Sequence, residues 1–207
     1  MTHSELVKKA RLWLESKSRC RFAFEELPGL GKPFTTGESP DVIGFGQGFS
    51  IVLEIKTSKQ DFKKDAEKPF REKPETGVGN YRLFVCAEGL IPKEELPKGW
   101  GLIEVTKRGA LKLIHGELGS CQNSRKRKTP FWFESNLEAE RGLLFTAMSR
   151  VYYSGLLGVI NAWNSNTYSF MVNQGNAELN SAGLAYQLGT VPEKTAKPRT
   201  QRRRKKK

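Results

Sequence analysis

Three charged residues in the first third of the chain have the types and spacing that metal-assisted hydrolysis requires. Asp41 precedes one apolar run, Glu54 lies late in the next, and Lys56 follows two residues later. Cleavage of a phosphodiester needs its charge neutralised, a water activated and the leaving oxygen stabilised, and a divalent metal contributes to all three. Mg²⁺ is held by one or two carboxylates together with water and substrate oxygens. A lysine beside it can order or deprotonate the attacking water. The pattern predicts a hydrolytic metal site.

A β-hairpin is the element that would bring the two acids together. Residues 41–45 and 50–57 flank Gly46-Gln47-Gly48, a turn of residues that tolerate positive φ. Asp41 lies six residues before Gln47 and Glu54 seven residues after it, so the two fall nearly opposite each other. Strand alternation puts Glu54 and Lys56 on one face. A buried strand carrying such a pair is costly without a partner or an ion. A purely structural salt-bridge cluster is the alternative interpretation.

The other expected elements form an α/β domain that ends near residue 116. Ser4 is the expected cap of a first helix, with Glu5 in its first turn. The apolar stripe of that helix is Leu6, Val7, Ala10, Trp13 and Leu14. Strands are expected at 20–26, 81–87, 100–105 and 110–115, the last two as a hairpin, with a short turn or helix at 92–96. A capped helix should begin at 57–58 and stop at Pro69. A helix followed by three strands, a helix, a strand and a hairpin indicates an α/β fold.

Beyond residue 116 the composition changes. Residues 117–135 are expected to be a basic linker, 136–192 a helical or irregular appendage, and 193–207 a disordered basic tail. One helix is expected over 136–157, with a buried side formed by Leu137, Leu144, Met148, Val151 and Tyr152. Residues 158–189 have no clear pattern. The run Phe131-Trp132-Phe133 is expected to pack in a core, with base stacking as the alternative.

The residues around the hairpin resemble a known superfamily. Ser39-Pro40-Asp41, twelve residues and Glu54-Ile55-Lys56 resemble the PD-(D/E)xK nuclease signature. Residues 1–116 also resemble the MmcB-type DNA-repair nucleases of bacteria and phages. Ser58-Lys-Gln-Asp61-Phe62-Lys-Lys-Asp65 matches their Ser-x-x-Asp-Phe-x-x-Asp run, and the segments beginning at Tyr81 and Glu95 match later ones. The helix after Lys56 departs from the family, because Pro69 and Pro74 end it early.

The resemblance implies a restriction-endonuclease-like core, a mixed sheet flanked by helices, and dependence on Mg²⁺ or Mn²⁺. It implies that the carboxylates of Asp41 and Glu54 hold the metal, with the backbone carbonyl of Ile55 as a further ligand. A further acid in this superfamily often comes from the first helix, which points to Glu5. Glu26 and Glu38 are rivals for that role, and the sequence does not decide among them.

The charge of the chain predicts DNA as the partner. The formal net charge is +13, and residues 193–207 contain nine basic residues and one acid, so they supply +8 and leave +5 elsewhere. Such a tail suggests a polyanionic partner; a tail that only keeps the protein soluble is the alternative. The expected phosphate contacts are Lys59, Lys63, Lys64, Arg125, Lys126, Arg127, Lys128, Arg202, Arg203 and Arg204. For the three lysines a solvated helix face is an equal alternative.

Several other classes find no support in the sequence. Three widely spaced cysteines and no CxxC pair argue against zinc or a disulfide framework. His3 and His115 are the only histidines, so the sequence gives no support for a Ser-His-Asp triad. No GxxxxGK[ST] loop indicates ATP, and no apolar run approaches the ~18 residues of a membrane span. We expect a cytoplasmic, metal-dependent deoxyribonuclease, acting in DNA repair or in phage or host DNA processing. The alternative is a catalytically silent DNA-binding or inhibitory protein on the same fold.

Overall fold

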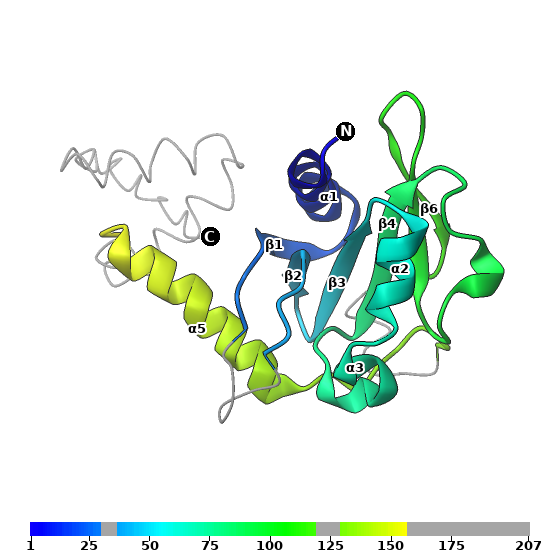
Figure 1. The fold of residues 1–207 in the computed structure, drawn as a ribbon. Helices are drawn as coiled ribbons and strands as arrows, with labels where there is room; N and C mark the ends of the chain where they lie inside the picture. The colour runs from blue at the N-terminus through cyan, green and yellow to red at the C-terminus, as the bar shows by residue number, and fades with distance from the viewer. Residues whose placement is uncertain (30–36, 119–128, 157–207) are drawn as a thin grey trace, which may run out of the picture. The chain divides into compact units, whose positions relative to one another are not determined.

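A six-stranded mixed β-sheet organises the chain, and the computed structural model describes residues 1–29, 37–118 and 129–156 (Figure 1). The strands follow one another across the sheet in sequence order. They are β1 (Cys20–Glu25), β2 (Val42–Gly46), β3 (Phe49–Lys56), β4 (Tyr81–Ala87), β5 (Gly101–Val105) and β6 (Leu111–His115). Strands β1 to β3 pair antiparallel, β3 to β5 pair parallel, and β6 returns antiparallel to β5. The expected α/β architecture with a mixed sheet is confirmed.

Helices cover both faces of this sheet. They are α1 (His3–Lys17), α2 (Lys59–Asp65), α3 (Pro69–Glu72) and α5 (Leu137–Tyr153), with short 3-10 turns η1 (Pro74–Thr76) and η2 (Lys93–Glu95). The apolar side of α1 packs on the face that carries Ile51, Leu53 and Ile55 of β3. Val52 and its neighbours face the other way, toward α5, and Phe62 of α2 packs with Phe84 of β4 on that same second face. The alternation of β3 therefore sends Glu54 and Lys56 to the face that α2 covers.

The expected hairpin is present and sets the register of the two acids. Val42 pairs with Leu53 and Gly46 with Phe49, and Gly48 takes a φ of 81° in the turn, which a residue without Cβ adopts freely. Extending the register by one step places Asp41 opposite Glu54. Strand β3 is buried along its whole length, so its charged residues are enclosed.

The first helix begins differently from the expectation. Its N-cap is Thr2 and not Ser4: the Thr2 hydroxyl accepts a hydrogen bond from the Glu5 backbone, and the Glu5 side chain accepts one from the Thr2 backbone. This is a capping box, in which two unpaired backbone donors are satisfied together. Glu5 lies in the first turn, as expected.

A break between α2 and α3 follows from a proline. Helix α2 ends at Asp65, and Lys68 takes an extended conformation (φ −67°, ψ 134°) before Pro69, which opens α3. A residue before proline is pushed toward extended geometry, and proline is well suited to the first turn of a helix. The helix is interrupted before Pro69, as expected, and α3 places Nη2 of Arg71 3.6 Å from Oε1 of Glu54.

The structure divides the chain into the units Met1–Ser149 and Arg150–Lys207, whereas the sequence placed a boundary near 116. Phe131 and Trp132 pack on the α1 side of the sheet, which confirms their core interpretation. In α5 the residues buried against Ile43 and Val52 are Ala139, Leu143 and Ala147. The expected buried face of this helix was wrong, because Leu137 and Met148 are 73% and 43% exposed.

Within the described ranges, no helix combines the length and the apolar character needed to cross a bilayer.

Candidate active site

Four of the residues that the sequence singled out for chemistry meet in one cavity of about 290 Å³ at the C-terminal end of β3. Asp41, Glu54, Ile55 and Lys56 all contribute to its wall. The complete lining is His3, Ser39, Asp41, Glu54, Ile55, Lys56, Asp61, Lys64, Asp65 and Lys68. Four carboxylates and three ammonium groups therefore face a small space in which a phosphate or a hydrated cation would fit.

Asp41 holds the end of β3. Its Oδ2 accepts a hydrogen bond from the backbone N–H of Ile55 at 2.7 Å, just past the last register pair of β2 and β3, Val42 with Leu53. Its Oδ1 lies 3.5 Å from Nε2 of His3. Burial raises the pKa of Asp41, and the charge of Glu54 raises it further. The two acids are thus close enough to interact, as the sequence predicted.

Glu54 is an almost fully enclosed acid of the cavity. Its side chain is 3% exposed, and Oε2 accepts hydrogen bonds from Nζ of Lys56 at 3.3 Å and of Lys68 at 3.0 Å. Its Oε1 is buried without a hydrogen-bond partner; Nη2 of Arg71 lies 3.6 Å away. A buried carboxylate oxygen that lacks a full hydrogen bond is costly, and it is the atom that a hard cation would satisfy.

Asp65 is a site residue that the spacing argument did not include, although it lies in the resembling Asp-Phe-x-x-Asp run. Its Oδ1 accepts from Lys56 at 2.9 Å and lies 2.8 Å from Nζ of Lys68. Its Oδ2 accepts from Nε of Arg71 at 2.6 Å. Burial would raise its pKa, but these three cations outweigh burial and hold the pKa of Asp65 far below its usual range.

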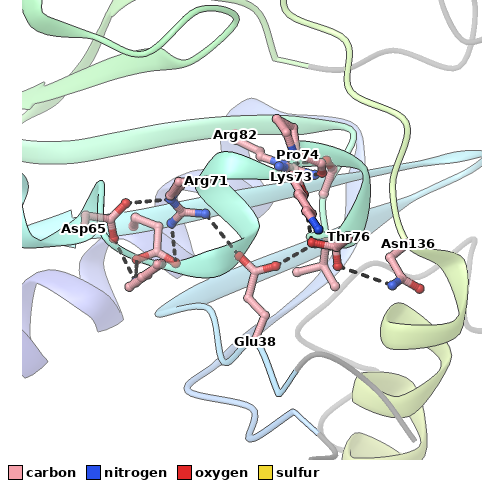
Figure 2. A network of polar contacts seen from close by, with 12 residues as sticks. Glu38, Asp65, Arg71, Lys73, Pro74, Thr76, Arg82 and Asn136 are labelled. Atoms are coloured by element: carbon pink, nitrogen blue, oxygen red, sulfur yellow. Dashed lines mark hydrogen bonds and ion pairs between the residues drawn. The ribbon is translucent and has the colours of Figure 1, made fainter. Parts of the chain in front are cut away.

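Arg71 ties the cavity to a second buried acid, Glu38 (Figure 2). Its Nη1 lies 3.3 Å from Oε1 of Glu38, whose Oε2 accepts from the Val78 backbone at 2.7 Å. The guanidinium also lies 4.3 Å from the ring of Trp100 and 4.9 Å from that of Phe70. Burial raises the pKa of Glu38 above its usual value. Arg71 is thus clamped by two carboxylates and two rings.

The same network continues toward α5 (Figure 2). Arg82 donates to the carbonyl of Pro74 at 2.8 Å, and the carbonyl of Thr76 accepts from the side chain of Asn136 at 3.3 Å. The segment after α3 therefore connects the ion cluster to the start of the last helix.

The three acids considered for an accessory role lie in different places. Glu5 is exposed and caps its own helix through the Thr2 backbone, a contact that lowers its pKa. Glu26 follows β1 with a φ of 46°, and its backbone N–H donates to the carbonyl of Asp41. Glu38 is the member of the three that an ion pair joins to the cluster, through Arg71. The accessory role predicted for Glu5 stays a prediction.

The predicted DNA-contacting residues also lie in different places. Lys64 lines the cavity, while Lys59 and Lys63 are exposed on α2. The basic run Arg125, Lys126, Arg127 and Lys128 and the tail residues Arg202, Arg203 and Arg204 lie outside the described residues.

The donor set fits magnesium or manganese better than a softer metal. Among the described residues, no group of three or more His, Cys, Asp and Glu side chains is arranged to hold an ion. Mg²⁺ does not need such a cage, because it keeps several waters and takes one or two carboxylates. Asp41, the unpartnered Oε1 of Glu54 and the carbonyl of Ile55 supply that kind of donor. The ammonium and guanidinium groups around Glu54 would compete with the metal.

Comparisons with known proteins assign no family. No family model matches the chain, and no curated protein matches it. Among solved structures, it is similar to the SPO1766 protein of unknown function from Silicibacter pomeroyi. The two share 16% sequence identity over 70% of this chain and 84% of that chain, with a TM-score of 0.41.

Proposed function

We propose that this protein is a metal-dependent deoxyribonuclease with a restriction-endonuclease-like core of the PD-(D/E)xK type. The observation that carries the proposal is the meeting of Asp41, Glu54 and Lys56 in one cavity at the end of β3. The basic balance of the chain supports a polyanionic substrate, and DNA repair or the processing of phage or host DNA is the proposed setting.

Four residues of the cavity would have tasks in this reaction. The carboxylates of Asp41 and Glu54 and the carbonyl of Ile55 would hold Mg²⁺ or Mn²⁺. A metal bound there supplies charge stabilisation to the phosphate and the leaving oxygen. Lys56, whose ammonium is held between Glu54 and Asp65, orders the attacking water at the cavity wall. Because that ammonium is anchored before substrate arrives, little reorganisation is needed in the transition state.

Substitution of the two acids tests the proposal. Asp41→Asn and Glu54→Gln should each abolish cleavage of plasmid and single-stranded DNA in Mg²⁺ or Mn²⁺. DNA binding should persist or tighten, because a negative charge facing the phosphate is removed. Glu67→Gln, an exposed residue after α2, is the matched control and should cleave like the wild type. Metal-dependent cleavage at wild-type levels in both acid variants would remove the assignment.

A second candidate function rests on the cations that surround Glu54. Lys56, Lys68 and Arg71 all lie within 4 Å of its carboxylate oxygens, so the charge of Glu54 is compensated without a metal. A DNA-binding or inhibitory protein that keeps the fold without turnover would have such a site. It predicts DNA binding with no cleavage in any divalent metal, and no effect of Glu54→Gln beyond stability.

A further inference from the structure

We propose that Lys68 is paired with Oε2 of Glu54 in the metal-free protein and moves onto the substrate phosphate when a divalent metal binds at the unpartnered Oε1 of the same carboxylate. This inference rests on the proposed function, since it names a substrate-binding residue of that site. It makes Lys68 an exchangeable cation, distinct in role from Lys56 and Arg71.

The first argument is the charge balance of the cluster. Three acids, Glu38, Glu54 and Asp65, are ion-paired with three cations, Lys56, Lys68 and Arg71. These six groups balance one another, and Asp41, the other proposed metal ligand, adds one negative charge beside Glu54. A divalent metal on Glu54 would add two positive charges beside three cations, and like charges at this distance in a buried site repel strongly. One cation must leave, or a phosphate must enter to compensate.

The second argument is that only one of the three cations is free to leave. The side chains of Lys56 and Arg71 are 5% and 6% exposed. Arg71 is fixed by Asp65, Glu38 and Trp100. Lys68 is 36% exposed and lies in the cavity wall, and its ring contact is with Phe70 at 5.8 Å.

The local backbone also allows this movement. Lys68 stands in the turn between α2 and α3, extended before Pro69, so its side chain is not part of a helix face. A lysine side chain has a flexible four-carbon stem and ends in a compact ammonium group. Such a side chain can move its charge from a carboxylate to a phosphate oxygen. In the metal-free cluster Glu54 and Asp65 hold it: burial would lower the pKa of Lys68, but the two acids outweigh burial and raise it.

The first experiment measures metal binding without DNA. Mn²⁺ is titrated into the full-length protein and free Mn²⁺ is followed by electron paramagnetic resonance. Lys68→Met should bind Mn²⁺ roughly three- to tenfold more tightly than the wild type, because the ion pair of Lys68 with Glu54 no longer competes with the metal. Lys68→Arg, which keeps the charge, should bind like the wild type. Lys73→Met, an exposed lysine at the end of α3, controls for the loss of one positive charge.

The second experiment measures DNA binding by fluorescence anisotropy on a short duplex, with and without Ca²⁺. With Ca²⁺, Lys68→Met should bind several-fold more weakly than the wild type; without Ca²⁺ the difference should shrink to that of Lys73→Met. Circular dichroism checks that each variant is folded. If Lys68→Met does not fold, Lys68→Gln replaces it in both experiments.

The outcomes separate this inference from the proposed function. Mn²⁺ affinity in Lys68→Met that is unchanged or weaker overturns the exchange, as does absence of Mn²⁺ binding in every variant. An equal loss of DNA affinity with and without Ca²⁺ overturns the transfer to phosphate. If both binding results are as expected but the wild type cleaves no DNA in Mg²⁺ or Mn²⁺, the exchange stands and the nuclease proposal fails.

Discussion

Glu54 is the residue on which the charges of the cavity converge. A carboxylate that is 3% exposed must be paired, because an isolated buried charge is far too costly. Lys56 and Lys68 satisfy one of its oxygens, while the other faces Arg71 at 3.6 Å without a hydrogen bond. The fold thus stabilises the buried acid–lysine pair on β3, which the sequence marked as costly. One oxygen of Glu54 still lacks a hydrogen bond.

The convergence of Asp41, Glu54 and Lys56 was predictable, whereas the partners of Glu54 were not. A two-residue alternation and a glycine turn decide which side chains of a hairpin share a face. Arg71 reaches the cluster from the short helix that Pro69 opens, and Glu38 lies in a buried position before β2. No spacing rule connects residues on such separate segments.

Lys56 is expected to act on turnover more than on affinity. Lys56→Met keeps most of the aliphatic stem but removes the ammonium that Glu54 and Asp65 orient. Turnover at saturating DNA should fall by about 10²–10⁴, the range typical of a lost proton-transfer or charge-stabilising group, with little change in DNA affinity. Single-turnover cleavage and anisotropy measure the two quantities. A fall in affinity with unchanged saturated turnover would make Lys56 a phosphate contact only.

Arg71 is expected to act on stability. Arg71→Met leaves Glu38 and Asp65 buried without their shared partner, and breaking a buried ion pair typically costs roughly 3–5 kcal/mol. The matched control is Arg141→Met, whose ion pair with Glu138 is largely exposed and should change stability by less than ~1 kcal/mol. Urea unfolding of both variants makes the comparison. An equal loss of unfolding free energy in the two variants would show that the buried contacts of Arg71 add no stability beyond that of an exposed ion pair.

At the scale of elements, the strands were more predictable than the last helix. Alternating or continuous apolar runs bounded by turns identify strands well, and all six form close to their expected bounds. For α5, the sequence predicts a buried side of large apolar residues, whereas the helix buries the small residues Ala139, Gly142 and Ala147 around Leu143. Small residues let the helix backbone approach the sheet closely. A prediction based on hydrophobicity alone therefore selected the wrong face of the helix.

Glu140 fixes that approach. Its Oε1 accepts hydrogen bonds from Ser50 of β3, from the Gly79 backbone at 2.9 Å and from Ser135. Glu140→Ala should lower the free energy of unfolding by roughly 2–4 kcal/mol, because buried donors lose their acceptor. Glu138→Ala, two residues earlier and exposed, should change it by less than ~1 kcal/mol. Chemical denaturation followed by tryptophan fluorescence tests this, and similar values would mean that α5 is held by apolar packing alone.

At the scale of the whole molecule, the first unit extends through Ser149. Phe131 and Trp132 complete the core beneath α1, and Leu143 completes the core on the opposite face. The domain boundary near 116 stays a prediction, because a change in composition marks a polar stretch but does not show whether the chain returns to the same core afterwards. The aromatic run 131–133 packs against this core.

The charge of the molecule is concentrated at its C-terminus, outside the described residues. Residues 193–207 carry +8 of the formal +13, while the three acids and three cations of the ion-paired cluster around Glu54 balance one another. Charge that is not needed for chemistry can still draw a polyanion to the protein, because each phosphate neutralised releases counterions. The tail is therefore expected to contribute affinity and the cavity to contribute turnover.

Deletion of residues 193–207 separates these contributions. Each phosphate that the tail neutralises adds about 0.9 to the log–log salt slope on duplex DNA. The truncated protein should bind DNA much more weakly at low salt, with a slope flatter by several units, and should keep its metal-dependent cleavage rate at saturating DNA. Affinity measured across a salt series on both proteins gives the slopes, and replacement of the tail by a neutral segment of equal length controls for chain length. An unchanged slope would show that the tail does not touch DNA. It would favour instead a localisation or protein-docking signal, which the block Arg202, Arg203 and Arg204 also permits.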